Sequence, residues 1–160
     1  MNKTELLKQV IARLEDDLLQ AQQAALTAYE TATHEENIAE NKYDTLGLEA
    51  SYLATGQARR AAAIRQTLAN WKQLVLRTFD PLLGIQLGAL IELSDDEDRR
   101  QCLFLGPDGA AMKLQQDSQS IQVIGPQAPL GLILIGKTVG DEVTLHVASG
   151  VQLLEILSVD

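Results

Sequence analysis

The chain has 160 residues, of which 46% are hydrophobic, and a formal charge of -9 from 22 acidic and 13 basic residues. This acidic balance excludes a protein that coats nucleic-acid phosphates through bulk charge. One cysteine, Cys102, excludes an internal disulfide and any multi-cysteine metal site, and no apolar run has the length of a signal peptide or a membrane span. We therefore expect a cytoplasmic protein without a membrane partner, organised as one domain or two small ones.

The first 33 residues have the pattern of one long helix. Apolar side chains recur at three- and four-residue spacing from Leu6 to Ala32, which predicts a single apolar stripe. Asn2 with Glu5 three residues later resembles a capping box, so the helix start is well marked.

A second helical segment follows, with Gly56 weakening its middle. Its apolar stripe is formed by Leu46, Leu53, Ala61, Ile64, Leu68, Trp71 and Val75. Two such stripes predict an antiparallel coiled-coil hairpin over residues 1–78.

The connection between the two helices, residues 34–44, is acidic. It contains Glu35, Glu36, Glu40 and Asp44, and like charges four residues apart oppose helix formation. The acids therefore favour either a functional tip or a solvated loop that keeps the hairpin soluble.

After Pro81 the hydrophobic period changes to two, which predicts a β domain over residues 79–160. The strands are expected at 86–93, 101–105, 111–114, 121–124, 142–147 and 151–157. The acidic run 95–98 is expected to be a solvated hairpin loop, and Cys102 to be inert packing. A short helix should lie within 128–137, with Pro129 near its start and Gly136 at its end. The fold class is therefore α+β: a helical hairpin followed by an antiparallel β domain with one short helix.

The order of these parts, and two motifs, resemble the GreA/GreB family of bacterial transcription elongation factors. In the second domain, Ala-Pro-Leu-Gly at 128–131, Leu-Ile-Gly-Lys at 134–137 and Gly-Asp at 140–141 look like the family signature. At the tip, the ungapped match to the family motif is residues 37–41, with Asn37 where the family has an aspartate and Glu40 on the family glutamate.

The resemblance implies an FKBP-like second domain that docks on RNA polymerase near its secondary channel, with the hairpin tip reaching the active centre. The docking residues would be Pro129, Leu130, Gly131, Leu134, Gly136 and Lys137. It also implies that Glu40, with Glu36 and Asn37, completes the shell of a polymerase-bound Mg²⁺ and stimulates cleavage of backtracked RNA. The factor would hold no metal of its own and would not be an enzyme by itself.

Several alternatives remain open on the sequence. Asn37 is a neutral amide, so a non-cleaving regulator that only occupies the secondary channel is the alternative function. Arg59 and Arg60 either form a basic patch near the nascent RNA or pair with neighbouring acids. A prolyl isomerase is suggested by fold expectation alone, and fold does not carry function. A coiled-coil adaptor that dimerises through its helices is the remaining alternative to the monomer that we expect.

Overall fold

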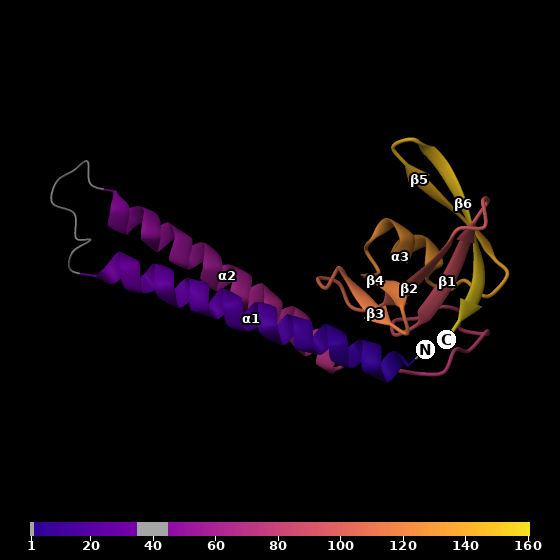
Figure 1. Cartoon of the computed structure of the whole chain (residues 1–160), viewed down its shortest axis with the longest axis horizontal. Coiled ribbons are helices and arrows are strands. Elements are labelled where there is room, and N and C mark those ends of the chain that lie inside the picture. The colour runs from indigo at the N-terminus through magenta and orange to yellow at the C-terminus, as the bar shows by residue number, and fades with distance from the viewer. Residues whose placement is uncertain (1, 35–44) are drawn as a thin grey trace. The chain divides into compact units, whose positions relative to one another are not determined.

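The computed structural model describes residues 2–34 and 45–160 (Figure 1). They divide into two compact units. One contains the residues up to Ile11 together with Asn70–Asp160, and the other contains Ala12–Ala69. Among the described residues, no helix is long and apolar enough to cross a membrane.

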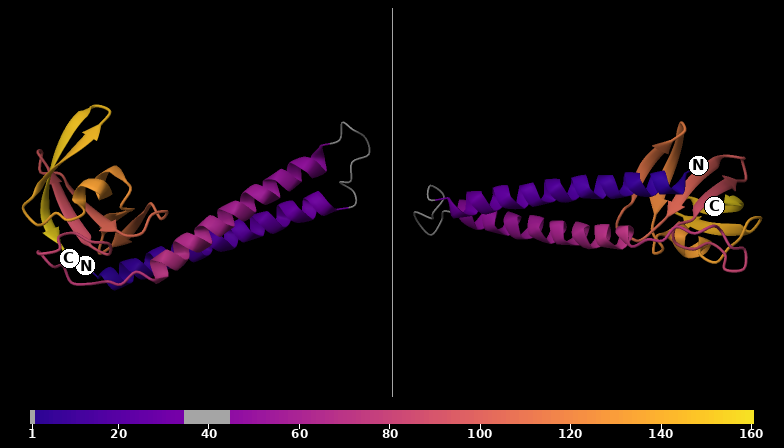
Figure 2. Two further views of the ribbon diagram at one scale, coloured as in Figure 1. Left: turned by 180° about the vertical axis from the view of Figure 1, so that it is seen from behind. Right: turned by 90° about the horizontal axis from the view of Figure 1, so that it is seen from below.

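Two long helices form the hairpin: α1, Lys3–Thr33, and α2, Leu46–Lys72. They run antiparallel and side by side in every view (Figures 1 and 2). The start of α1 is capped as predicted, because Asn2 Oδ1 accepts the backbone N–H of Glu5 at 3.2 Å. Leu14, Ala21 and Ala28 are buried at seven-residue spacing, which is typical of a coiled-coil seam.

The prediction for the seam of α2 was partly wrong. Leu53 is 56% exposed, and Val75 lies beyond the end of α2 and is 62% exposed. The buried and partly buried positions of α2 instead include a three-four repeat, namely Ala50, Ala54, Gln57, Ala61, Ile64, Leu68 and Trp71. Ala61, Ile64, Leu68 and Trp71 were predicted correctly, whereas the prediction took Leu53 in place of Ala50, Ala54 and Gln57.

The β domain contains one six-stranded sheet with the strand order β3-β4-β2-β1-β6-β5. Its elements are β1 Leu90–Asp95, β2 Arg100–Leu105, β3 Met112–Gln116, β4 Gln119–Ile124, β5 Glu142–Val147 and β6 Gly150–Val159. The short helix α3, Pro129–Leu134, lies between β4 and β5. All six predicted strands and the short helix are present, which confirms the predicted fold class.

Two details of the sheet differ from the prediction. The strand expected at 86–93 begins only at Leu90, because Gly88 has φ +94° and the preceding residues turn. The β2·β4 pair is parallel. Asp117 and Ser118, both at positive φ, close a two-residue β3·β4 hairpin. Of these two strands, β4 lies beside β2 and β3 lies at the edge of the sheet.

One core cluster includes inward side chains of the sheet and the buried Leu134 of α3. Ile91, Leu93, Leu103, Leu154 and Ile156 belong to it and are almost fully buried. This arrangement agrees with the expectation of one helix packed on a curled sheet.

A second contact involves the end of α2. Trp71 is fully buried, and its ring centroid lies 5.9 Å from that of Phe104 on β2 at an interplanar angle of 58°. A Cβ added at Gly106 would lie 2.1 Å from the Trp71 ring. Trp71, which the sequence placed in the coiled coil, therefore also packs on the β domain.

Candidate functional site

The helix α3 is positioned by the residues at its two ends. Pro129 occupies its first turn, where a missing N–H costs little, and Gly136 ends it with φ +81°. The Gly136 N–H donates to the Ile85 carbonyl at 2.9 Å, and the Ile85 N–H donates to the Lys137 carbonyl at 2.8 Å. The end of α3 is therefore tied to the segment that precedes β1.

The loops around α3 are held by two aspartates. Asp108 Oδ1 accepts the Gln127 N–H at 3.2 Å just before the helix. After the helix, Asp141 Oδ2 accepts the Thr138 N–H at 2.9 Å, while the Asp141 N–H donates to the Thr138 carbonyl at 3.1 Å. The Gly-Asp motif at 140–141 thus closes the turn that leads into β5.

The residues predicted to dock a partner fall into two groups. Pro129, Gly136 and Lys137 are exposed and Leu130 is partly buried, whereas Gly131 and Leu134 are buried. A Cβ at Gly131 would lie 2.0 Å from the Gly125 carbonyl oxygen. The buried pair therefore holds α3 against the domain, and only the others can meet a partner directly.

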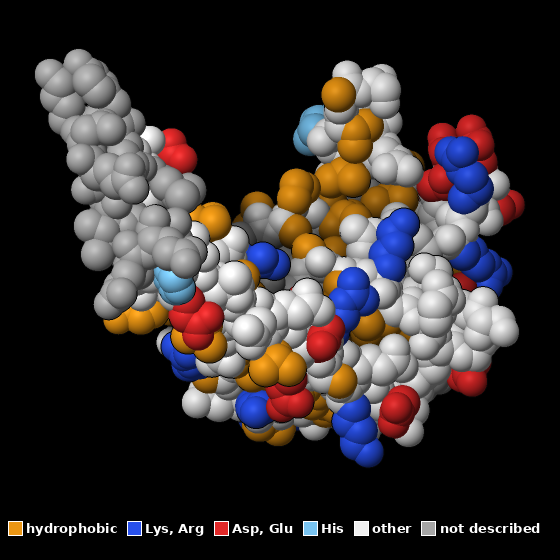
Figure 3. Space-filling view, turned by 60° about the vertical axis from the view of Figure 1, so that its left-hand side comes forward, with side chains coloured by type: hydrophobic (Ala, Val, Ile, Leu, Met, Phe, Trp, Pro, Cys, Tyr) orange, Lys and Arg blue, Asp and Glu red, His pale blue; other side chains and the backbone are white. Residues whose placement is uncertain are grey.

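An exposed apolar surface adjoins these residues. We call it the α3 surface, and its members are Leu132 (60% exposed), Ile135 (41%), Val139 (48%) and Val147 (41%). Figure 3 shows hydrophobic side chains gathered below the tip of the β5-β6 hairpin. Sequence reasoning did not single out Ile135, Val139 or Val147. The i,i+3 spacing of Pro129, Leu132 and Ile135 was the available signal for part of this surface.

Positive charge lies next to this surface. The Lys137 side chain is exposed and forms no ion pair or side-chain hydrogen bond within the described part of the chain. An apolar patch bordered by a free ammonium group is suited to a protein surface with exposed apolar and acidic side chains.

Arg59 and Arg60 lie on α2 in the other unit, and both are exposed. No described acidic side chain forms an ion pair with either of them. Their guanidinium groups are therefore available to an external anion such as a phosphate.

The tip residues Glu36, Asn37 and Glu40 lie outside the described residues. Within residues 2–34 and 45–160, no three His, Cys, Asp or Glu side chains are grouped closely enough to hold a metal ion.

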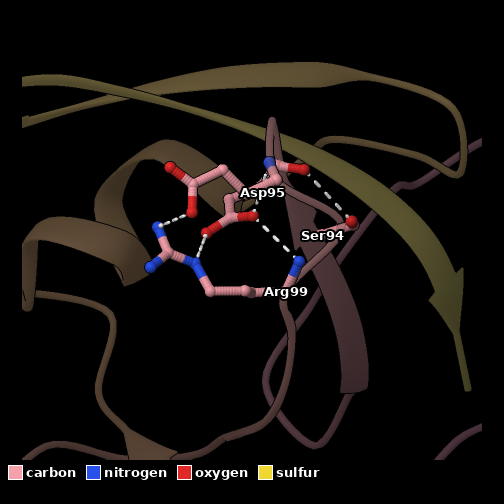
Figure 4. A network of polar contacts seen from close by, with 4 residues as sticks. Ser94, Asp95 and Arg99 are labelled. Atoms are coloured by element: carbon pink, nitrogen blue, oxygen red, sulfur yellow. Dashed lines mark hydrogen bonds and ion pairs between the residues drawn. The ribbon is translucent and has the colours of Figure 1, made fainter.

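The acidic turn between β1 and β2 is built around Asp95 (Figure 4). One Asp95 carboxylate oxygen accepts the N–H groups of Glu97 and Arg99, each at 2.9 Å, and the other accepts the Arg99 Nε–H at 2.8 Å. The Arg99 backbone N–H contributes most to lowering the pKa of Asp95, and the Arg99 guanidinium lowers it further. These hydrogen bonds hold the predicted hairpin loop together.

Neither an isomerase nor a cysteine-based site is supported by the β domain. Phe104, its only aromatic residue after Phe79, is fully buried and lines neither the cavity of about 490 Å³ nor that of about 600 Å³. Among the described residues, Phe79 is the one aromatic side chain that lines the cavity of about 600 Å³, so this cavity is not aromatic-lined. Cys102 lines the smaller cavity, where burial raises the pKa of its thiol and the charge of Glu92 raises it further. The reactive thiolate is therefore disfavoured.

Comparison with known proteins finds a family match for the C-terminal part of the chain. Residues 84–160 match the family described as transcription elongation factor, GreA/GreB, C-terminal. No curated protein matches the chain in sequence.

Three solved structures resemble the chain. GreA factor homolog 1 (Gfh1) of Thermus thermophilus is 20% identical, with 94% of each chain covered and a TM-score of 0.40. Gfh1 of Thermus aquaticus is 20% identical, with 92% of each chain covered and a TM-score of 0.42. A GreA/GreB factor from Nitrosomonas europaea is 19% identical over 61% of this chain and 78% of that one, with a TM-score of 0.39. Because these identities are low, the family assignment depends on the sequence match, and it applies to residues 84–160, which form a GreA/GreB C-terminal domain.

Proposed function

We propose that this protein binds bacterial RNA polymerase at the secondary channel through its C-terminal domain and acts there as an accessory elongation factor. The observation that carries the proposal is the GreA/GreB match over 84–160, the region that also presents the α3 surface. The factor works in the cytoplasm, binds polymerase as a single copy and has no catalytic activity of its own.

The proposed activity is stimulation of transcript cleavage in backtracked complexes. Glu40, helped by Glu36 beside Asn37, completes the coordination of a weakly held Mg²⁺ of the polymerase and orients the attacking water. The support for this step is the sequence of the tip. A regulator that occupies the channel without cleavage is the alternative, because Asn37 is neutral where the family has a carboxylate.

Arg59 and Arg60 are proposed to contact the nascent RNA or the channel wall. Their exposure and their lack of described ion-pair partners support this role. Phosphate contacts of this kind strengthen binding without reading sequence.

Binding is tested with Leu132→Asp, measured by fluorescence polarisation against core RNA polymerase. Leu132 is 60% exposed, so the substitution leaves the core intact while placing a charge in the α3 surface. We expect at least about tenfold weaker binding, the effect of losing a central apolar contact. The matched control is Leu82→Asp, since Leu82 is 95% exposed and lies outside this surface. Equal affinity of L132D and the wild type would overturn the docking assignment.

The cleavage step is tested on stalled, backtracked complexes with wild-type protein and Glu40→Gln. Under the cleavage proposal, wild-type protein accelerates cleavage, and E40Q loses this effect while still binding polymerase. If the wild type binds but does not accelerate cleavage, the non-cleaving regulator is the correct reading. If neither protein binds, the proposed function fails as a whole.

A further inference from the structure

The two edge strands of the sheet, β3 and β5, differ in whether another element forms hydrogen bonds to them. At the β3 edge, Gln9 Nε2 donates to the Gln115 carbonyl at 3.3 Å, and the Asn2 N–H donates to Gln116 Oε1 at 2.9 Å. The start of α1 thus meets this edge, which also carries the charged Lys113. The β5 edge has no such cover. Within the described part of the chain, no hydrogen bond reaches Glu142–Val147 from any element other than β6.

The backbone hydrogen bonds show which β5 residues face outward. The Ile156 N–H donates to the Asp141 carbonyl at 2.9 Å, so Asp141 directs its carbonyl toward β6. With the two-residue period of an antiparallel ladder, Val143, Leu145 and Val147 do the same. The N–H and C=O groups of Glu142, Thr144 and His146 therefore point away from the sheet.

Apart from the charge of Glu142, these outward residues lack the features that usually block an open edge. Natural sheets protect such edges with lysine, proline or a bulge. The sequence of β5 is Glu-Val-Thr-Leu-His-Val, with no lysine, arginine or proline. Its pairing with β6 is regular throughout, and Glu142, Thr144 and His146 are all exposed.

The strand is complementary to itself in one antiparallel register. A two-fold axis through Thr144 places Glu142 opposite His146 of a second copy, Val143 opposite Leu145, and Thr144 opposite Thr144. In this register every outward backbone group of one strand faces an outward group of the other, giving about six hydrogen bonds. The side-chain pairs are a carboxylate with an imidazole donor, two aliphatic residues, and two threonines, all of which are favourable across strands. An axis through Val143 or Leu145 would also pair outward groups, but it would give only about four hydrogen bonds within the strand and would not place Glu142 opposite His146.

We propose that two copies of this protein associate through their β5 edges, antiparallel and centred on Thr144, to form one continuous sheet. This association uses the sheet edge and is distinct from dimerisation through the helices. A pair of six-residue strands lies at the small end of protein interfaces, so the dimer is reversible, with a dissociation constant on the order of 10–100 μM.

The test is sedimentation equilibrium of the full chain across that concentration range. Thr144→Lys places two like charges on the two-fold axis, and we expect at least about tenfold weaker dimerisation. Ser120→Lys is the matched control, because Ser120 is exposed on β4, which is paired on both sides, and its dimerisation should equal that of the wild type. Circular dichroism and the thermal midpoint check that each variant is folded.

A charge exchange tests the register. His146→Glu alone places carboxylates opposite one another and should weaken the dimer, whereas the double variant Glu142→His with His146→Glu restores both pairs and should recover it. Wild-type protein that stays monomeric throughout, a T144K protein that dimerises normally, or a double variant that is no better than the single one would each overturn this pairing. None of these outcomes bears on polymerase binding, which is measured separately.

Discussion

Gly56 and Gly131 differ in how much space surrounds their Cα atoms. A Cβ added at Gly56, in the middle of α2, would have no heavy atom within 4 Å, whereas one at Gly131 would lie 2.0 Å from the Gly125 carbonyl oxygen. No close contact therefore requires a glycine at position 56. Gly131, in contrast, permits the close approach of α3 to a neighbouring loop.

The same substitution should therefore have opposite effects at these two sites. Gly56→Ala is expected to raise the free energy of unfolding by about 0.5–1 kcal/mol, because alanine loses less backbone entropy in a helix. Gly131→Ala should lower it by about 1–3 kcal/mol through overpacking. Urea denaturation of both variants gives the comparison, and a destabilised Gly56→Ala protein would contradict an open environment at this position.

Asp95 should make stability depend on pH in the acid range. Its folded-state pKa is lowered, mainly by the Arg99 backbone N–H, so its contribution is present above the ordinary aspartate value of about 4. The contribution is lost as the pH falls through the lowered folded-state pKa. Asp95→Asn should therefore be less stable than the wild type at pH 7, and the difference should shrink below about pH 4.

The measurement for Asp95 is the urea midpoint of both proteins at several pH values. Asp96→Asn serves as the control because Asp96 is an exposed acid in the same turn, and its substitution should leave the midpoint nearly unchanged. A difference between wild type and D95N that stays constant from pH 7 to the acid limit would contradict the role of the carboxylate charge.

At the scale of elements, α2 has an imperfect buried seam. Gln57 occupies one of its repeating positions, and its Oε1 atom is buried without a hydrogen-bond partner in the described structure. A buried acceptor without a partner costs about 1–3 kcal/mol relative to a satisfied one. The hairpin therefore retains a polar group where an aliphatic residue would be more stable.

Gln57→Leu should accordingly stabilise the protein by about 1 kcal/mol. The comparison is Gln23→Leu, an exposed α1 position at which the same change should have an effect within about 0.5 kcal/mol. Thermal unfolding followed by circular dichroism measures both. Destabilisation by Gln57→Leu would indicate that the glutamine has a partner or that the site cannot accept a branched side chain.

The short helix α3 shows how much of the candidate site the sequence could predict. Pro129 and Gly136 predicted its start and end because both act through the local backbone. The sequence did not distinguish Leu132, which is exposed, from Leu134, which is buried, because both are leucines in one apolar run. That distinction depends on which helix face meets the sheet.

At the scale of the whole molecule, one compact unit combines two segments that are far apart in the sequence, the residues up to Ile11 and Asn70–Asp160. Trp71 belongs to this unit, and its buried ring contacts Phe104 and the Gly106 backbone region. Its Nε1 atom has no hydrogen-bond partner within the described residues. Trp71 therefore contributes to the stability of this unit by packing and not by a hydrogen bond of its indole N–H to a described residue.

Trp71→Ala should lower the free energy of unfolding by about 3–5 kcal/mol, whereas Trp71→Phe should cost less, because it keeps an aromatic ring and loses no hydrogen bond. Chemical denaturation followed by circular dichroism measures both variants without relying on the lost indole. Equal losses for the two substitutions would show that the indole N–H or the larger ring is essential.

The sequence by itself determined the order of helices and strands, the helix cap at Asn2, the turn at Gly136 and the match that assigns residues 84–160 to the GreA/GreB family. These features depend on local periodicity, backbone preference and short motifs. Tertiary structure alone decided the seam of α2, the parallel β2·β4 pair, the α3 surface and the open β5 edge. Each of these depends on which distant residues are neighbours, and side chains of the same type are buried or exposed according to those neighbours.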